Sequence, residues 1–419
     1  MTLTLDDAPT TEFPISRVRE VFPALRAADG FVFFDNAAGA QIPDQALNEV
    51  KRHLVQHNVQ RGGRYGRSVE VDRAISRARS KIADFLGAGD PREVCFGMNA
   101  TTFIRQVSLA LGQSLGSGRS EIVVTDMDHE ANIATWRALE SSRTRIRWWR
   151  MRDDGRLHVE DLKPLLTRRT RLVACTAASH ALGSRVDIPA VAEMAHKVGA
   201  ELFVDAVHYA PHGPIDVKAW GCDYLVCSGY KIFGPHMGFL WGRFEALRAL
   251  PTFREDFIPD EPPHKIEAGT FVYENVSGMS ATLDYLAGLG AGMVGAGGLR
   301  ERLTAAMNGI LAYERGLSAR MLEVLSGVNA TVYGVADPER AVDRVPTFLF
   351  NLKGLHPAQV AEAAAKAGFG IRDGHMYAPH LMARLGLDMD WGAVRVSLSH
   401  YNTLDEIDRF GDFLRRLVG

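Results

Sequence analysis

The residue with the clearest chemical potential in this sequence is Lys231, which follows an apolar run at residues 223–228. The run has the pattern of a buried strand, and Ser228-Gly229 ends it. A buried lysine normally has a partner, so Lys231 is either an ion-pair residue or a reactive amine. Desolvation lowers the pKa of a lysine, and the neutral amine can form a Schiff base. Taken alone, Lys231 favours the ion-pair interpretation.

Asp205 favours the reactive-amine interpretation of Lys231 over the ion-pair interpretation. It lies 26 residues before Lys231 and ends another apolar run, 200–205. An acid at the C-terminal end of a parallel strand faces the crevice in which α/β proteins bind ligands. An enzyme that depends on pyridoxal 5'-phosphate (PLP) needs a lysine and an aspartate, and here they lie on successive strands. The lysine holds the aldehyde as an imine, and the carboxylate keeps the pyridine nitrogen protonated.

An anion site is indicated near residue 100. The sequence predicts a strand at 94–96, a turn of small residues and a helix at 102–115. Free N–H groups and the helix dipole favour an anion there, and Thr101 and Thr102 add hydroxyl donors. The alternative is an ordinary threonine N-cap. The stretch is neither GxxxxGK[ST] nor GxGxxG, so a P-loop or a nicotinamide cofactor is not indicated.

His129 follows a predicted strand at 121–125 and is therefore expected at the C-terminal edge of the sheet. An imidazole there could stack on a flat aromatic cofactor, or it could be a hydrogen-bonded loop histidine. The basic, aromatic run 143–150 alternates, which predicts a strand with one solvated face rather than a nucleic-acid site.

The elements that must position these residues alternate between strand and helix from residue 31 to about 241, which predicts an α/β fold. We expect a large domain at 31–290, with a mostly parallel, seven-stranded sheet between helices. The Gly/Ala-rich stretch 287–298 and a long helix at 299–325 predict a junction. The small α/β domain would combine residues 1–30 with 291–419.

Composition narrows the class of protein. The 419 residues are 46% apolar and 23% charged, and the net charge is 48 − 50 = −2. This gives no support for nucleic acid or an anionic membrane as a partner. The four cysteines form no CxxC pair and predict reduced core residues of a cytoplasmic protein without a metal cluster. Residues 1–12 are polar and acidic, unlike a signal peptide, and no apolar run reaches the ~20 residues that span a membrane.

Several ordered motifs together resemble the class V aminotransferases of PLP fold type I, and among them the cysteine desulfurase-like group. The resemblance covers residues 31–410. Its motifs are 35–38 (DNAA), 58–62 (NVQRG), 100–102 (ATT), 128–133 (DHEANI), 202–207 (LFVDAV), 227–235 (CSGYKIFGP), 267–270 (EAGT), 395–398 (RVSL) and 401–403 (YNT).

The resemblance implies a role for each matching position. Lys231 forms the Schiff base and serves as general base, Asp205 pairs with the ring nitrogen, and His129 stacks on the ring. The other implied cofactor residues are Thr101, Thr102, Val207, His208, Ser228 and Tyr230, with Thr270 reaching the phosphate of the neighbouring subunit in a homodimer. The implied substrate residues are Ala38, His180, Arg372, Tyr377 and Arg395, of which Arg395 holds the α-carboxylate.

The sequence also departs from the family pattern. Sulfur-mobilising desulfurases carry a nucleophilic cysteine after Arg-x-Gly-His, and here that loop reads RDGHMYAP, with Tyr377 at or next to the cysteine position. A persulfide needs a thiolate. The family's asparagine, glutamine and histidine near the cofactor are replaced by His180, His208 and Tyr230.

These departures favour a PLP-dependent enzyme that acts at Cα and Cβ of an amino acid, as a desulfurase-like or β-elimination lyase without an enzyme persulfide. The alternatives are an aminotransferase or an epimerase. A non-catalytic PLP-fold binding protein disagrees with the lysine, aspartate, histidine and arginine at the matching positions. The expected assembly is a homodimer with active sites at its interface, and the sequence does not specify a sulfur acceptor.

Overall fold

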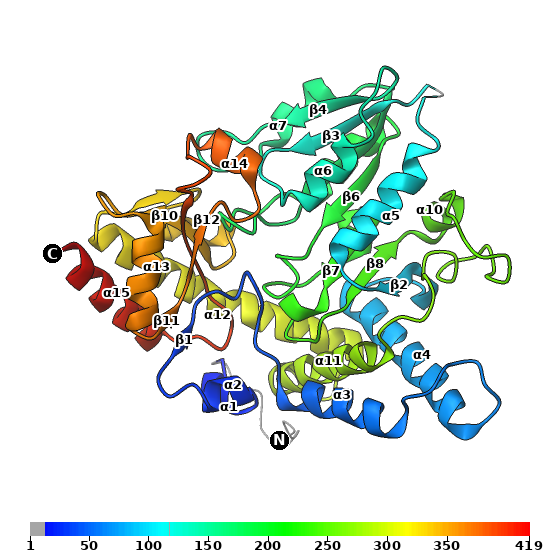
Figure 1. The fold of residues 1–419 in the computed structure, drawn as a ribbon, viewed down its shortest axis with the longest axis horizontal. Coiled ribbons are helices and arrows are strands. Elements are labelled where there is room, and N and C mark those ends of the chain that lie inside the picture. Colours follow the sequence, from blue (N-terminus) through cyan, green and yellow to red (C-terminus); the bar gives the residue numbers. More distant parts are fainter. Residues whose placement is uncertain (1–12, 117) are drawn as a thin grey trace.

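The computed structural model describes residues 13–116 and 118–419 of the chain (Figure 1). The polar stretch 1–12, and with it part of the predicted small domain, lies outside the described residues. Within the described part of the chain, no helix is long and apolar enough to cross a membrane.

A seven-stranded sheet forms the centre of the larger part of the molecule, with the strand order β2-β8-β7-β6-β5-β3-β4. Only β8 runs antiparallel to its neighbours, so the predicted mostly parallel sheet is confirmed. The strands are β2 (Val94–Gly97), β3 (Glu121–Thr125), β4 (Arg145–Trp149), β5 (Thr170–Thr176), β6 (Glu201–Asp205), β7 (Tyr224–Ser228) and β8 (Gly238–Gly242). The sequence interpretation missed β8.

Helices cover both faces of this sheet, because alternate side chains of each strand point in opposite directions. On β5, Leu172 and Ala174 belong to the core beneath α5 and α6, whereas Val173 and Cys175 belong to the core shared with α4, α8 and α11. These helices are α4 (Gly66–Leu86), α5 (Ala100–Gly112), α6 (Ala131–Arg137), α8 (Ile188–Lys197) and α11 (Tyr273–Val294).

A second, four-stranded sheet is built from the C-terminal part and is antiparallel throughout, in the order β12-β13-β10-β9. Its strands are β9 (Thr331–Tyr333), β10 (Thr347–Asn351), β12 (Arg372–Gly374) and β13 (Ala393–Ser397), and it packs with α13 (Pro357–Lys366) and α15 (Leu404–Val418). The helix α12 (Leu299–Gly327) joins the two parts. Its first half belongs to the large core and its second half to the small one (Figure 1).

One sequence expectation needs correction. The strand expected at 31–34 does not begin the large sheet: β1 (Val32–Phe33) pairs in parallel with β11 (Phe369–Gly370). The reason is aromatic packing, since the Phe34 ring contacts those of Phe369 and Phe410. The Gly/Ala-rich stretch 287–298, predicted as a junction, is mostly helical, because α11 continues to Val294 and residues 295–298 separate it from α12. The domain division at residue 290 stays a prediction.

The remaining elements are short or connect the larger ones. They are α1 (Ile15–Glu20), α2 (Pro23–Arg26), α3 (Asp44–Gln56), η1 (Pro91–Glu93), α7 (Val159–Leu162), η2 (Lys163–Leu165), α9 (Val217–Trp220), η3 (Gly229–Lys231), α10 (Phe244–Ala249), η4 (Pro338–Asp343) and α14 (Pro379–Arg384).

Candidate active site

A cavity of about 830 Å³ lies where the C-terminal ends of the parallel strands meet the small sheet. Thr176, Asp205 and Ser228, the last residues of β5, β6 and β7, line it, as expected for ligand sites in α/β sheets. The predicted site residues found on its wall are Ala38, Thr101, Thr102, His129, His180, Asp205, Val207, His208, Ser228, Tyr230, Lys231, Arg372, Tyr377 and Arg395.

Lys231 lies in the short helical turn η3, directly after β7. Its Nζ donates a hydrogen bond to the main-chain carbonyl of Ala37 in the turn after β1. Burial, and then the positive charge of Arg395, lower the pKa of Lys231 to about 7. The amine is therefore neutral in a large fraction of molecules at neutral pH, which is the form that attacks an aldehyde.

Asp205 ends β6 and is 7% exposed. Its Oδ1 accepts a hydrogen bond from the amide of Val207 at 3.0 Å. Burial raises the pKa of Asp205 to about 6. A cationic partner in the cavity would favour the ionised carboxylate, because an opposite charge nearby lowers the pKa of an acid.

His129 follows β3, and its Nδ1 accepts a hydrogen bond from the amide of Ala131 at 3.0 Å. Burial, together with the charges of Lys231 and Arg395, lowers the pKa of His129 to about 4, so the ring is neutral. Asp128, to which the sequence interpretation gave no role, is fully buried and has a pKa raised by burial to about 7. It accepts from Thr125 and from Asn132 Nδ2, the latter at 2.6 Å.

The N-terminus of α5, where the sequence predicts an anion site, lies on the cavity wall, and its cap differs from the threonine alternative. Asn99 is the N-cap, and its Oδ1 accepts from the amide and the hydroxyl of Thr102 at 2.9 and 3.0 Å. Ser228 Oγ accepts from the Ala100 amide at 3.2 Å. Gly238 on β8 permits this approach, since a Cβ there would lie 2.6 Å from the main chain of Asn99.

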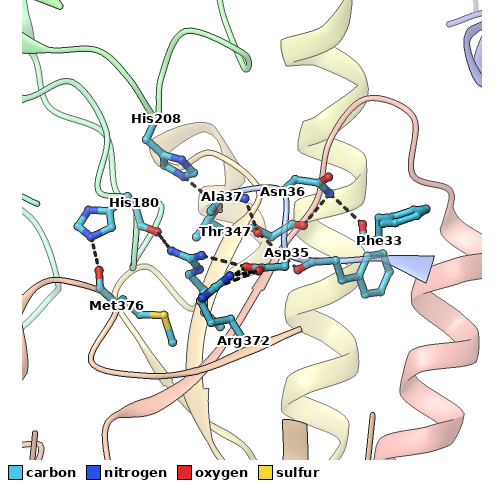
Figure 2. A network of polar contacts seen from close by, with 12 residues as sticks. Phe33, Asp35, Asn36, Ala37, His180, His208, Thr347, Arg372 and Met376 are labelled. Atoms are coloured by element: carbon cyan, nitrogen blue, oxygen red, sulfur yellow. Dashed lines mark hydrogen bonds and ion pairs between the residues drawn. The ribbon is translucent and has the colours of Figure 1, made fainter. Parts of the chain in front are cut away.

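Two arginines that line the cavity, Arg372 and Arg395, both pair with Asp35, and Figure 2 shows the pair of Arg372 with Asp35. Arg395 Nη2 lies 2.9 Å from Asp35 Oδ1, and Arg372 Nη2 lies 2.8 Å from Asp35 Oδ2. Arg395 also donates to the carbonyl of His180 at 3.1 Å. Its side chain is only 3% exposed, against 38% for Arg372. The sequence contained a signal for Asp35, which begins the DNAA motif, but its role was missed.

The two histidines that depart from the family pattern contact the small-sheet side of the cavity. His180 Nε2 donates to the carbonyl of Met376 at 2.7 Å, and His208 Nε2 lies 2.9 Å from Thr347 Oγ1 (Figure 2). Burial lowers the pKa of both histidines well below the ordinary value, so both rings are neutral. The ring of Tyr230 stacks on that of His236, with centroids 4.8 Å apart.

Thr270 is the predicted site residue that lies away from the cavity of its own chain. It is exposed, in the loop before α11, and its Oγ1 accepts a hydrogen bond from Gln60 Nε2 at 2.6 Å. Its predicted role toward a neighbouring subunit stays a prediction.

The four cysteines are Cys95, Cys175, Cys222 and Cys227; all lie in the described part of the chain, and all are buried and unpaired there. None of them lines the cavity. Burial raises the thiol pKa of each, so these cysteines are not thiolates near neutral pH.

The residues present fit PLP. A buried amine of lowered pKa and a buried carboxylate of raised pKa line one cavity, together with a neutral imidazole and the N–H groups of a helix N-terminus. Lys231 would hold the aldehyde carbon, Asp205 the ring nitrogen, His129 the ring face and the start of α5 the phosphate. When bound, the cofactor supplies a sink for the electrons of a substrate carbanion.

Comparison with known proteins agrees with this assignment. The family model described as Aminotransferase class-V matches residues 32–410. The chain is 35% identical to Aminotransferase-like protein FGM3 of Gibberella zeae, over 96% of this chain and 97% of the relative. It is 32% identical to a probable cysteine desulfurase of Synechocystis sp., over 96% and 95% of the two chains. An apo structure of cysteine desulfurase from Thermococcus onnurineus superimposes with a TM-score of 0.86 at 26% identity, covering 98% and 99%.

The chain belongs to the class V aminotransferase family. Its fold is that of the PLP-dependent enzymes of fold type I, and it is a PLP-dependent enzyme of the cysteine desulfurase-like group.

Proposed function

We propose that this enzyme is a lyase that removes a β-substituent, such as the sulfur of a cysteine-type substrate, without forming an enzyme persulfide. The observation that carries the proposal is the cavity wall: Tyr377 lies where the resemblance places the nucleophile, and all four cysteines are buried outside the cavity. A thiolate is required to accept sulfur from the substrate, so the leaving group would depart directly.

The charges of the site support a substrate with one carboxylate at the Asp35 end. Arg372 and Arg395 share the single carboxylate of Asp35, which leaves one positive charge in excess. A substrate α-carboxylate would balance that charge, and a guanidinium binds it with two parallel hydrogen bonds. The amine of Lys231, once free, would take the α-proton, because its lowered pKa makes it a base near neutral pH.

The products of L-cysteine test the proposal. Elimination gives sulfide, and the three-carbon product hydrolyses to pyruvate and ammonia, whereas a persulfide route gives alanine and protein-bound sulfur. Purified holoenzyme should release sulfide and pyruvate in equal amounts from cysteine, and pyruvate together with the departing β-substituent from another β-substituted amino acid. Lys231→Ala should release neither. Alanine together with a persulfide on the protein would contradict the proposal.

An aminotransferase is the second candidate, and its support is the similarity to the aminotransferase-like relative of Gibberella zeae. Single turnover with an amino-acid panel separates the two functions. An aminotransferase leaves pyridoxamine phosphate and a keto acid that keeps its β-substituent, whereas an epimerase changes only the α-configuration. Either result without elimination products would replace the lyase proposal. Protein that binds no PLP would contradict all three.

We further propose that the enzyme works as a homodimer, in the cytoplasm. Thr270 would complete the phosphate site of the partner, since it lies outside the cavity of its own chain. Large apolar side chains are exposed on the preceding loop, with Phe253 at 92% and Phe257 at 82%, and Val55 at the end of α3 is 75% exposed. Apolar surface of this kind favours burial against another subunit.

A further inference from the structure

We propose that His180 is a positioning residue that fixes the turn at 375–378, so that the phenol of Tyr377 contacts the substrate side chain at the mouth of the cavity. The activity readout of this inference rests on the proposed function. The fixed turn itself is a property of the chain and can be measured without a substrate.

The turn has a costly backbone conformation. Met376 and Tyr377 have φ angles of 53° and 55°, in the left-handed region that side chains other than glycine rarely adopt. Such a residue is strained and persists only where the surroundings enforce its conformation. Two in succession therefore require an external support.

Three groups supply that support. His180 Nε2 donates to the Met376 carbonyl at 2.7 Å, and the Glu130 amide donates to the Tyr377 carbonyl at 3.0 Å. The amide of Tyr377 donates to His375 Nδ1 at 3.1 Å. The Met376 side chain is 2% exposed in the core, while that of Tyr377 is 57% exposed. The turn thus buries the side chain of Met376 and leaves that of Tyr377 exposed.

His180 connects this turn with the carboxylate end of the cavity. Its main-chain carbonyl accepts from Arg395 Nη1 at 3.1 Å, while its ring holds Met376, as Figure 2 shows for the His180–Met376 contact. An asparagine, the family's residue here, has a shorter side chain than histidine. The histidine therefore gives this chain a support for the turn that reaches across from the large part of the molecule.

The presented phenol faces the reacting end of the cavity. Tyr377 lines the cavity, and its ring lies 5.9 Å from that of His129, centroid to centroid. A substrate whose carboxylate lies on Arg395 would extend its side chain past Tyr377. The phenol can donate a hydrogen bond to a polar β-substituent and its ring can cover it.

A double-mutant cycle on the holoenzyme tests the inference. We expect Tyr377→Phe and His180→Ala each to lower kcat/KM about tenfold, the effect of losing one hydrogen bond to the substrate. The double variant should be no worse than His180→Ala, because without the support the phenol is already misplaced. Independent effects would multiply to about a hundredfold and would overturn the inference.

Hydrogen exchange gives the readout that needs no catalysis. In His180→Ala, the amides of Glu130 and Tyr377 should exchange faster than in the wild type, while melting temperature and PLP absorbance stay close to wild type. His158→Ala is the matched control, since its ring contacts Asp154 outside the cavity; it should leave exchange and kcat/KM unchanged. Unchanged exchange in His180→Ala would refute the support of the turn. If the enzyme were inactive on every substrate, the proposed function would be refuted. The exchange result would then still show whether His180 supports the turn.

Discussion

At the scale of single residues, burial rather than position in the sequence determines what Lys231 and Asp205 can do. Their pKa values move toward each other, to about 7 and about 6, because the cavity wall disfavours both charges. A lysine in water keeps its proton near neutral pH, whereas this one is reactive. The ion-pair interpretation that the sequence favoured for Lys231 alone is therefore not the one that the site supports.

The pH dependence of cofactor capture follows from this shift. Only the neutral amine reacts with PLP, so the rate of capture by the apoprotein should rise through a midpoint near pH 7, the lowered pKa of Lys231, and level off above it. Stopped-flow absorbance of apoprotein mixed with PLP measures it. A rate still rising between about pH 9 and 10, where an exposed lysine titrates, would contradict the burial argument. Lys231→Ala gives the baseline.

The two arginines should differ in their importance for substrate binding. Arg395 is nearly buried and holds both Asp35 and the His180 carbonyl, while Arg372 is 38% exposed. Arg395→Lys removes the planar fork and should raise KM about 10- to 100-fold with a small change in kcat. Arg372→Lys is the matched comparison and should raise KM by less than about fivefold. Steady-state kinetics of both variants check the order, and equal effects would contradict it.

At the scale of elements, the close packing of α11 on α12 supports the whole site, because these helices lie beneath the sheet that carries Lys231 and Asp205. The glycines of α11 permit this contact. A Cβ on Gly290 would lie 1.8 Å from the carbonyl oxygen of Arg302, whereas a Cβ on Gly292 meets nothing within 4 Å.

This contrast gives a matched pair of variants on one helix. Gly290→Ala should lower the free energy of unfolding by about 1–3 kcal/mol or more, the cost of overpacking. Gly292→Ala should leave it unchanged or raise it by up to about 1 kcal/mol, since alanine favours the helix. Denaturant unfolding of both variants measures the difference. Equal stabilities would show that the two helices can separate at no cost.

At the scale of the whole molecule, the proposed dimer can be tested through Thr270. We expect Thr270→Val to weaken PLP binding about tenfold, through the loss of one hydrogen bond to the phosphate. A dimer of one Lys231→Ala subunit and one Thr270→Val subunit should regain up to half of wild-type activity, because one of its two sites is then intact. Differently tagged subunits, co-expressed and purified as the mixed dimer, allow the measurement. If the mixed dimer is no more active than the parent variants, Thr270 acts in the site of its own subunit.

The sequence alone predicted the fold class, a seven-stranded sheet and fourteen of the residues that line the cavity. Most of these residues came from the family resemblance, and the others from the rule that parallel strands carry their last residues to one edge. Asp205 and His129 follow directly from that rule. It did not predict β8, whose five-residue run Gly238–Gly242 gives little periodic signal, or the pairing of β1 with β11.

Contacts between residues far apart in the chain were decided only by the tertiary structure. Asp35 meets Arg395 across 360 positions, and His180 meets Met376 across 196. No local pattern encodes such partners, since they depend on how the small sheet packs against the large one. The chemistry of the cofactor site is therefore determined by the sequence, while the support of the turn that presents Tyr377 exists only in the folded molecule.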